Sequence, residues 1–432
     1  MKAIPSRLHA ALADYVLQSW NELGMGQFII QMEMDFEGRL DLERLSRAHT
    51  LLLDAEPVLG CRLIVHPQLP YWERLSDAER NGFCQTNARE DYERFMFADL
   101  DSTVDPQVKA CVWRRPEGDR LLLKVAHQAA DAGGTKDIAA LLADLYGRLG
   151  HDPQYQPEPN LHGSREADQI LRRIPRYAYP QLLWNGLRKT IAGAVPKRTL
   201  TLPLDIGPRA PWGYVVRHLL PDHVERLAQY GRARQATLND LMVAAFYHAL
   251  VQAGNWNGQS ALRLQITLDL RRWHLPNERA EAVCNLSGYE YPFLGRSLGR
   301  DFDETLARVS GIMRRRKRNW PGLSEILLFN QFRRFTYADL VNFEKKLLGR
   351  AIESGNFPNA LTNMGPIAPE RVRFDDLRPT SAYLLTPIIY PPLFGIGLSG
   401  YAGSLTLSAG VPECARCPIE SFFDALIAAL PC

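Results

Sequence analysis

Strand-like and helix-like segments are mixed in both halves of this chain, and this mixing is the feature that most constrains its fold. Apolar residues that alternate or run continuously predict strands, and leucines at helical spacing predict helices. The predicted strands cover residues 28–35, 107–114, 120–126, 214–219, 261–268, 359–364, 395–399 and 404–409, and the predicted helices cover residues 41–53, 136–149, 222–230 and 238–252. Because they do not alternate as regular βαβ units, the pattern predicts an α/β fold with a mixed sheet in each half.

The length of the chain, 432 residues, predicts more than one core. Residues 151–198 are rich in proline and polar side chains before an aromatic, basic segment, which is typical of a connection between lobes. We therefore predict an N-terminal lobe at residues 1–170, a connection at 171–205 and a C-terminal lobe at 206–432. The composition, 46% hydrophobic and 23% charged, is that of an average globular protein and excludes a disordered or collagen-like chain.

Charge and cysteine content indicate which partners and which compartment to expect. The net charge is +3, and the densest basic run, residues 314–318, is either a solvated helix face or a contact for an anionic partner such as coenzyme A or an acidic carrier protein. We expect no nucleic-acid partner. The seven cysteines are odd in number and widely spread, which favours a reducing compartment over a disulfide framework.

Targeting signals are not evident. The apolar stretch at residues 8–17 is interrupted by His9 and Asp14, so it lacks a signal-peptide core, and no apolar run approaches the roughly 20 residues of a membrane span. We expect a cytoplasmic protein. Cys414 and Cys417 form a lone CxxC without a second pair, so no metal site is expected there.

Two sequence patterns of known enzymes are matched or nearly matched, but the residues around them do not fit. Residues 395–400 read GIGLSG and match the dinucleotide pattern GxGxxG, but residues 404–409 predict a strand where that fingerprint requires a helix. Ser399 is followed two positions on by Tyr401, where the nucleophile elbow GxSxG requires glycine. The sequence therefore favours neither a dinucleotide enzyme nor a serine hydrolase.

His127 is the strongest candidate for a functional side chain. It directly follows the predicted strand that ends at Ala126, and Ala132, Gly133 and Gly134 are expected to form a loop before a helix capped by Thr135. The stretch AHQAADAG at residues 126–133 resembles the HHxxxDG motif of the chloramphenicol-acetyltransferase-like and condensation-domain superfamily. His127 matches the catalytic second histidine and Asp131 matches the aspartate, whereas Ala126 and Ala132 stand in place of the first histidine and the glycine.

Further blocks resemble the same superfamily in the same order along the chain. They are residues 41–62 near the start, the ND motif at Thr237–Asp240, the DLR block at Asp269–Arg271 with Asn285–Gly288, and the late block at Thr362–Pro366. The resemblance spans about residues 25–410. It implies two lobes that meet in a V, with a tunnel between them and His127 midway along it.

The resemblance also implies roles for individual residues. It gives His127 the role of general base, and it makes Asp131 an architectural residue that turns away from substrate to pair with Arg271. Ser287 and Asn363 are candidates for polar contacts with an oxyanion or an acceptor, or else they cap backbone groups at strand ends. If the backbone at Ala132 required a positive φ, alanine would cost about 1 kcal/mol, unless Gly133 takes over the turn.

The resulting prediction is an acyltransferase that moves an acyl group from a coenzyme A or carrier-protein thioester to a hydroxyl or amine. A histidine with a pKa near 6.5 is mostly neutral at pH 7 and suits the general base. Since no serine or cysteine can be paired with His127, we predict direct attack without an acyl-enzyme, and no tightly bound cofactor. Three alternatives remain: a free-standing condensation enzyme, a non-catalytic binding module, and a core histidine at position 127. A metal pair of His127 and Asp131 lacks a third ligand.

Overall fold

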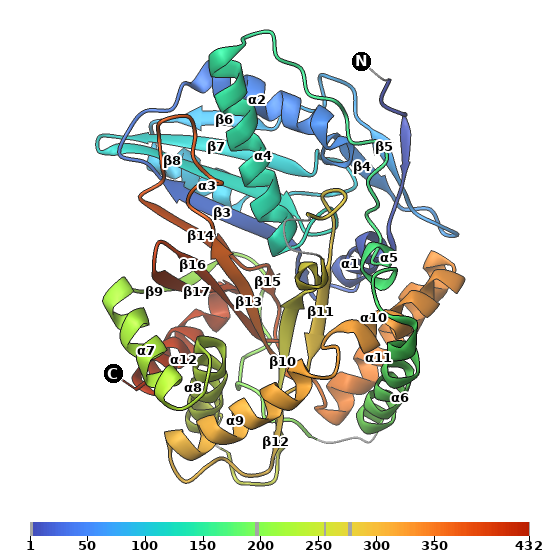
Figure 1. The fold of residues 1–432 in the computed structure, drawn as a ribbon, viewed down its shortest axis with the longest axis vertical. Coiled ribbons are helices and arrows are strands. Elements are labelled where there is room, and N and C mark those ends of the chain that lie inside the picture. The colour runs from blue at the N-terminus through green and yellow to red at the C-terminus, as the bar shows by residue number, and fades with distance from the viewer. Residues whose placement is uncertain (1–2, 195–197, 255, 275–278, 432) are drawn as a thin grey trace.

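The computed structural model describes residues 3–194, 198–254, 256–274 and 279–431, so residues 195–197 of the predicted connection and Cys432 lie outside the described residues. Figure 1 shows two sheet-containing lobes, one above the other. The upper lobe is built on a five-stranded sheet in the order β14-β3-β8-β7-β6. Its strands are β3 (Ile29–Asp35), β6 (Phe83–Thr86), β7 (Val108–Arg115), β8 (Gly118–Ala126) and β14 (Ser381–Leu385).

The two faces of this sheet are covered by different helices. Helices α2 (Leu42–Ala55) and α4 (Ala132–His151) pack on one face, and α3 (Arg89–Phe97) covers the other. Side chains alternate along β8 accordingly: Leu121 and Leu123 join the large core under α2 and α4, whereas Leu122 packs with Tyr92 of α3. Helix α1 (Leu12–Glu22) and a small sheet of β1 (Arg7–His9), β5 (Tyr71–Arg74) and β4 (Cys61–Ile64) complete this lobe.

The lower lobe contains a nine-stranded sheet in the order β11-β10-β13-β16-β17-β15-β2, with β12 on β10 and β9 on β17. The strands are β2 (Gly26–Gln27), β9 (Trp212–Leu219), β10 (Leu262–Asp269), β11 (Ser287–Glu290), β12 (Phe293–Gly295), β13 (Asn359–Ile367), β15 (Ile388–Ile389), β16 (Gly395–Tyr401) and β17 (Ser404–Pro412). Parallel and antiparallel pairs both occur in it. The prediction of an α/β fold with mixed sheets is confirmed.

Helices surround the lower sheet. Four of them belong to its core or its edge, α7 (Pro221–Ala233), α8 (Leu238–Ala253), α9 (Phe302–Lys317) and α12 (Arg416–Ala428). Four more lie to the right in Figure 1: α5 (Asp168–Leu171), α6 (Tyr179–Ala194), α10 (Leu323–Phe329) and α11 (Tyr337–Ser354). Among the described residues, none of the helices is both long and apolar enough to cross a bilayer.

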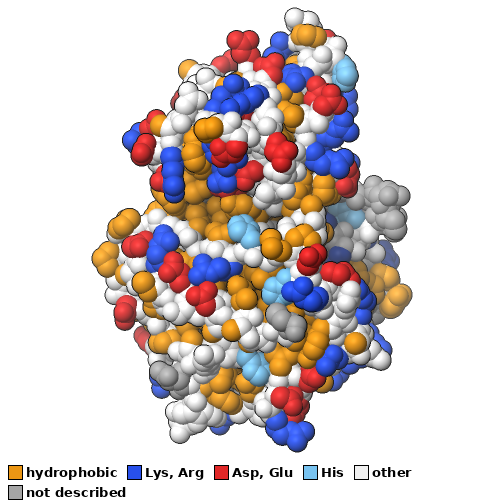
Figure 2. Space-filling model, turned by 90° about the vertical axis from the view of Figure 1, so that its left-hand side faces the viewer, with side chains coloured by type: hydrophobic (Ala, Val, Ile, Leu, Met, Phe, Trp, Pro, Cys, Tyr) orange, Lys and Arg blue, Asp and Glu red, His pale blue; other side chains and the backbone are white. Residues whose placement is uncertain are grey.

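The lobes exchange strands, so sheet membership does not follow chain order. β14, which lies within the predicted C-terminal lobe, pairs with β3 of the upper sheet. In the other direction, β2 leaves the N-terminal half to pair with β15. The boundaries 1–170, 171–205 and 206–432 therefore describe the order of the chain but not which strands share a sheet. On the face shown in Figure 2, apolar side chains gather where the two lobes meet.

The start of α4 differs from the sequence prediction. The helix begins at Ala132, and Asp131 caps it by accepting a hydrogen bond from Gly134 N at 2.8 Å. Ala132, Gly133 and Gly134 are thus its first turn, and Thr135 is inside it. The prediction of a loop capped by Thr135 is wrong because the side chain of Asp131, four residues before Thr135, already accepts the free N–H of Gly134.

Two buried serines fasten β14 to the lower sheet. Ser399 Oγ accepts a hydrogen bond from Leu384 N at 3.0 Å, and Ser408 Oγ donates one to Leu384 O at 3.1 Å. Since β14 also pairs with β3, this single strand is bonded to both lobes. Ser399, which nearly completes a nucleophile elbow in the sequence, is therefore engaged in holding backbone.

Replacing Ser399 by alanine should leave the buried N–H of Leu384 without an acceptor. We expect Ser399→Ala to lower the free energy of unfolding by about 1–3 kcal/mol, measured by urea denaturation. Ser354→Ala is the matched control, because its exposed hydroxyl bonds only to carbonyls of its own helix. Equal losses in the two variants would contradict this account of β14.

Candidate active site

A cavity of about 310 Å³ lies between the lobes, and His127 is in its wall. Both lobes contribute: α1 and β3 from above, and β10, β13 and β16 from below. Most of the lining surface is apolar, and polar residues are interspersed in it. They are His127, Asp131, Arg165, Glu166, Gln265, Thr267, Asn285, Ser287, Tyr289, Glu325, Asn330, Thr362 and Thr386.

The hydrogen bonds of the His127 ring define its tautomer. Nδ1 lies 3.1 Å from Ala130 O and 3.2 Å from Asn285 Oδ1. The amide of Asn285 is oriented in turn, because its Nδ2 donates to His127 O at 3.0 Å and to Gln128 O at 3.1 Å. With two oxygens facing it, Nδ1 must carry the hydrogen, so Nε2 holds the free lone pair. The ring is thus presented as a base.

Asn285 is a site residue that the sequence analysis did not single out. It comes from the lower lobe, 158 positions away from His127 in the chain, and holds the ring and two backbone carbonyls at once. The signal was present in the block Asn285–Gly288, but a spacing pattern does not say which member of the block faces the histidine. Only the packing of the lobes decides this.

Asp131 and Arg271 form the ion pair between lobes. Arg271 Nη1 lies 2.9 Å from Asp131 Oδ1, and the two side chains are 14% and 2% exposed. Asp131 Oδ2 also accepts hydrogen bonds from Leu286 N at 2.8 Å and from Ser287 Oγ at 3.0 Å. Burial by itself would raise the pKa of Asp131, but Arg271 and the backbone N–H groups of Gly134 and Leu286 outweigh it and hold the pKa below its usual value. The carboxylate therefore stays charged.

Position 133 requires glycine because the Arg271 side chain lies close to its Cα, and not because of its backbone angles. A Cβ at this position would lie 2.3 Å from Arg271 Nη1 and 2.8 Å from its Cζ. Neither Gly133 nor Ala132 has a positive φ, because both lie in the first turn of α4. The strain considered for Ala132 is therefore absent, and the small residue at 133 makes room for the guanidinium.

A second buried arginine, Arg165, supports the loop of residues 127–131. Its Nη1 donates to Ala129 O at 3.3 Å and to Val283 O at 2.6 Å, and its Nη2 lies 2.7 Å from Asp14 Oδ1. Asp14 is fully buried on α1 and also accepts a hydrogen bond from Trp72 Nε1. Sequence reasoning missed this pair because Arg165 stands in an irregular polar stretch where no periodicity marks it.

The burial of His127 favours the neutral form of its ring. Burial lowers the pKa of His127 below its ordinary value, although the nearby Asp131 carboxylate acts in the opposite direction. A neutral ring at pH 7 is the form that accepts a proton. Among the described residues, no group of three His, Cys, Asp or Glu side chains is placed to hold a metal ion.

The two polar residues predicted for substrate contacts lie in different places. Ser287 lines the cavity, but its hydroxyl donates to Asp131. Asn363 lines a separate groove, where it donates to Asn239 and accepts from Gly365 N. The alternation of β13 explains this, because Thr362 and Met364 point into the cavity and Asn363, between them, points away. Asn363 thus lies outside the cavity of His127, and its Oδ1 accepts a backbone N–H, as in the second of the two roles predicted for it.

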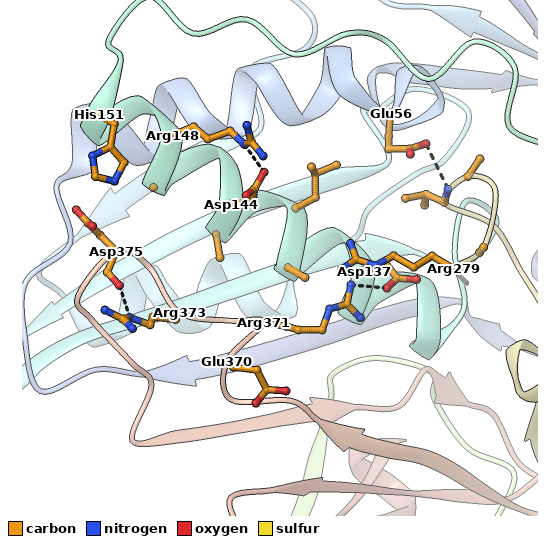
Figure 3. A pocket seen from close by; sticks show the side chains of 17 residues that line it. Glu56, Asp137, Asp144, Arg148, His151, Arg279, Glu370, Arg371, Arg373 and Asp375 are labelled. Carbon is orange, nitrogen blue, oxygen red and sulfur yellow. Dashed lines mark hydrogen bonds and ion pairs between the residues drawn. The ribbon is translucent and has the colours of Figure 1, made fainter. Parts of the chain in front are cut away.

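A larger groove of about 870 Å³ runs along the outer side of α4 but does not reach His127. Figure 3 shows its charged side chains, among them two acid–base pairs. Arg148 lies 2.7 Å from Asp144, and Arg371 lies 2.9 Å from Asp137. Because two of its acid–base pairs neutralise each other and the groove does not contain His127, the smaller cavity is the better candidate site.

The Asp131–Arg271 pair should be strongly coupled. We expect Asp131→Ala and Arg271→Ala each to lower the free energy of unfolding by about 3–5 kcal/mol, because each leaves a buried charge without its partner. The double variant should lose less than the sum. The exposed pair of Asp144 and Arg148 is the control and should give about 0.3–0.5 kcal/mol in the same denaturation experiment. Additive losses at Asp131 and Arg271 would show that the pair is not coupled.

Comparison with known proteins identifies the fold. No protein-family model matches this sequence, and no curated protein sequence matches it. Solved structures do. Polyketide synthase associated protein 5 from Mycobacterium tuberculosis is similar with a TM-score of 0.65 at 17% identity, over 97% of this chain and 96% of that one.

Two further structures cover nearly the whole chain. The first condensation domain of the calcium-dependent antibiotic synthetase has a TM-score of 0.69 at 17% identity, over 98% of this chain and 97% of that one. The trichothecene 15-O-acetyltransferase from Fusarium sporotrichioides has a TM-score of 0.71 at 12% identity, over 98% and 95%. The resemblance seen around His127 is confirmed at the level of the fold. The chain has the two-lobed α/β fold that chloramphenicol-acetyltransferase-like acyltransferases share with condensation domains.

Proposed function

We propose that this protein transfers an acyl group from a coenzyme A or carrier-protein thioester to a hydroxyl or amine, with His127 as the general base. The observation that carries the proposal is the state of the His127 ring. Nδ1 is held by Ala130 O and Asn285 Oδ1, whereas Nε2 has no hydrogen-bond partner among the described residues. A lone pair that is fixed in direction and lies in the wall of a cavity between lobes is what this reaction requires.

The reaction follows from this geometry. The acceptor gives its proton to Nε2 while its oxygen or nitrogen attacks the thioester carbonyl, which becomes a tetrahedral oxyanion. When that intermediate collapses, the C–S bond breaks and the imidazolium returns the proton to the departing sulfur, which leaves as a thiol. Ala130 O and Asn285 Oδ1 both accept from Nδ1–H, so they stabilise the ring while it is positively charged.

Direct attack fits the side chains near His127 better than an acyl-enzyme does. Ser287 lines the cavity, but its hydroxyl is engaged with Asp131. Cys284 is buried, and burial raises the pKa of its thiol to about 12, so it is not a thiolate nucleophile at neutral pH. We therefore propose a ternary complex, in a cytoplasmic setting, with no tightly bound cofactor.

The lining suggests the kind of substrate. Leu12, Val16 and Trp20 of α1 and Ile326 and Phe329 of α10 line the cavity, and we call these residues its apolar arm. They favour an aliphatic or aromatic chain. The similarity in fold to a condensation domain at a TM-score of 0.69 supports the second candidate, a free-standing condensation enzyme with carrier-bound partners. Both candidates use the same base.

Release of free thiol tests the proposal. The protein is incubated with a panel of acyl-coenzyme A thioesters and of alcohols and amines, and thiol is followed over time. We expect turnover with at least one pair, and a loss of about 10²–10⁴-fold in kcat in His127→Ala. His151→Ala, on the exposed end of α4, is the control and should keep full activity. No turnover with any pair would favour the binding module, and turnover that survives His127→Ala would exclude the proposed base.

The pH dependence of kcat/KM should report the His127 ring. Because burial lowers the pKa of His127, the free base is the main form at pH 7 and is lost only when the pH falls through a value below about 6.5. We expect kcat/KM to be level between about pH 7 and 8 and to fall on acidification below about 6.5. A half-maximal point above about pH 7 would show that another group controls the reaction.

A further inference from the structure

Helix α6 carries large apolar side chains on its outer face. Leu183, Trp184 and Leu187 are 54%, 60% and 49% exposed, and Tyr177, just before the helix, is exposed as well. Spacings of three and four residues place them along one stripe. The inner face packs on α10, where Leu182 is buried and a Cβ on Gly186 would lie 3.0 Å from Leu328. A helix that only covered a core would carry polar side chains on this outer face.

The surroundings of the stripe are basic. From Gln169 to Ala194 the chain contains no Asp or Glu. Arg176 and Arg188 are exposed and have no ion-pair partner among the described residues. Lys189, by contrast, turns inward and lies 2.8 Å from Glu290.

The end of α9 extends this positive surface. Gln181 of α6 donates a hydrogen bond to Asn319 Oδ1 at 3.0 Å, and Asn319 follows α9 directly. Arg315, Lys317 and Arg318 are exposed there, and they belong to the basic run that stands out in the sequence. We call the whole area the α6 surface, which comprises Arg176, Tyr177, Leu183, Trp184, Leu187 and Arg188 with Arg315, Lys317 and Arg318.

The α6 surface lies one helix away from the cavity. Helix α6 packs on α10, and α10 supplies Glu325, Ile326 and Phe329 to the cavity wall. Lys189 reaches across this contact to pair with Glu325. The apolar arm of the cavity and the apolar stripe therefore lie on opposite sides of the same short helix.

We propose that the α6 surface binds the surface of an anionic lipid bilayer. The bilayer interface accepts aromatic and leucine side chains into its acyl boundary while lipid phosphates attract the arginines beside them. The stripe supplies the apolar side chains, and Arg176 and Arg188 supply the positive charges. No carboxylate within Gln169–Ala194 would repel the lipid phosphates. Docking here would bring the apolar arm of the cavity close to the bilayer.

Vesicle cosedimentation tests this with the full-length protein. We expect binding to vesicles of phosphatidylcholine mixed with phosphatidylglycerol, little binding to phosphatidylcholine alone, and release when salt rises from about 0.1 M to about 0.5 M. Leu183→Gln, Trp184→Gln and Leu187→Gln together should lower the partition coefficient by about tenfold or more. Arg176→Gln and Arg188→Gln should each lower it by about fivefold.

The matched control is Leu220→Gln with Arg226→Gln, an exposed apolar and basic pair at the start of α7, across the molecule from α6 in Figure 1. It should bind like the unchanged protein. Failure of the unchanged protein to bind anionic vesicles, or binding that the α6 variants leave intact, would overturn the proposal. So would α6-dependent binding to an acidic carrier protein without binding to vesicles. Cosedimentation needs no turnover, so its result is independent of the thiol-release experiment.

Discussion

The ion pair between Asp131 and Arg271 sets the geometry on which the rest of the site depends. Asp131 caps α4, accepts the backbone N–H of Leu286 and holds Arg271, so one carboxylate joins a helix start in the upper lobe to the lower lobe. The Leu286 N–H lies next to Asn285, whose amide orients the ring of His127. Loss of the carboxylate would therefore remove the acceptor of the Leu286 N–H, next to Asn285, as well as the partner of Arg271, and the position of Asn285 and the direction of Nε2 would be less well fixed.

Exchange of strands explains how a cavity can exist between the lobes without separating them. β14 and β2 cross in opposite directions, and each is bonded to the sheet of the other half. The lobes are thereby held at the two crossings, while the space around His127 is left to side chains. Such a construction keeps a mostly apolar cavity open, because closing it would require the two crossing strands to move with their sheets.

The sequence was sufficient to predict most helices and strands and the contact of Asp131 with Arg271. It was not sufficient to predict which side chains meet between the lobes. Periodicity predicted β3, α2, β7, β8 and α4 to within a few residues, since each forms one face of a core. The Asp131–Arg271 contact came from the resemblance around His127. Asn285, Arg165 and Asp14 were missed because Asn285 meets His127, and Arg165 meets Asp14, across more than 100 residues of chain, where only tertiary packing decides the contact. The two roles predicted for Asn363 could not be separated from the sequence, because a block of residues in a strand does not show which of its members faces the cavity.

The two departures from the HHxxxDG pattern lie outside the contacts that orient His127. Ala126 ends β8 opposite Ile29 and is fully buried with Ile29 and Leu100, so a small apolar residue fills the place of the first histidine. Ala132 lies in the first turn of α4 without a positive φ. Neither side chain bonds to the ring, whose Nδ1 is held by Ala130 O and Asn285 Oδ1. The direction of the Nε2 lone pair therefore does not depend on the side chains at positions 126 and 132, and the role of base proposed for His127 is compatible with alanine at both.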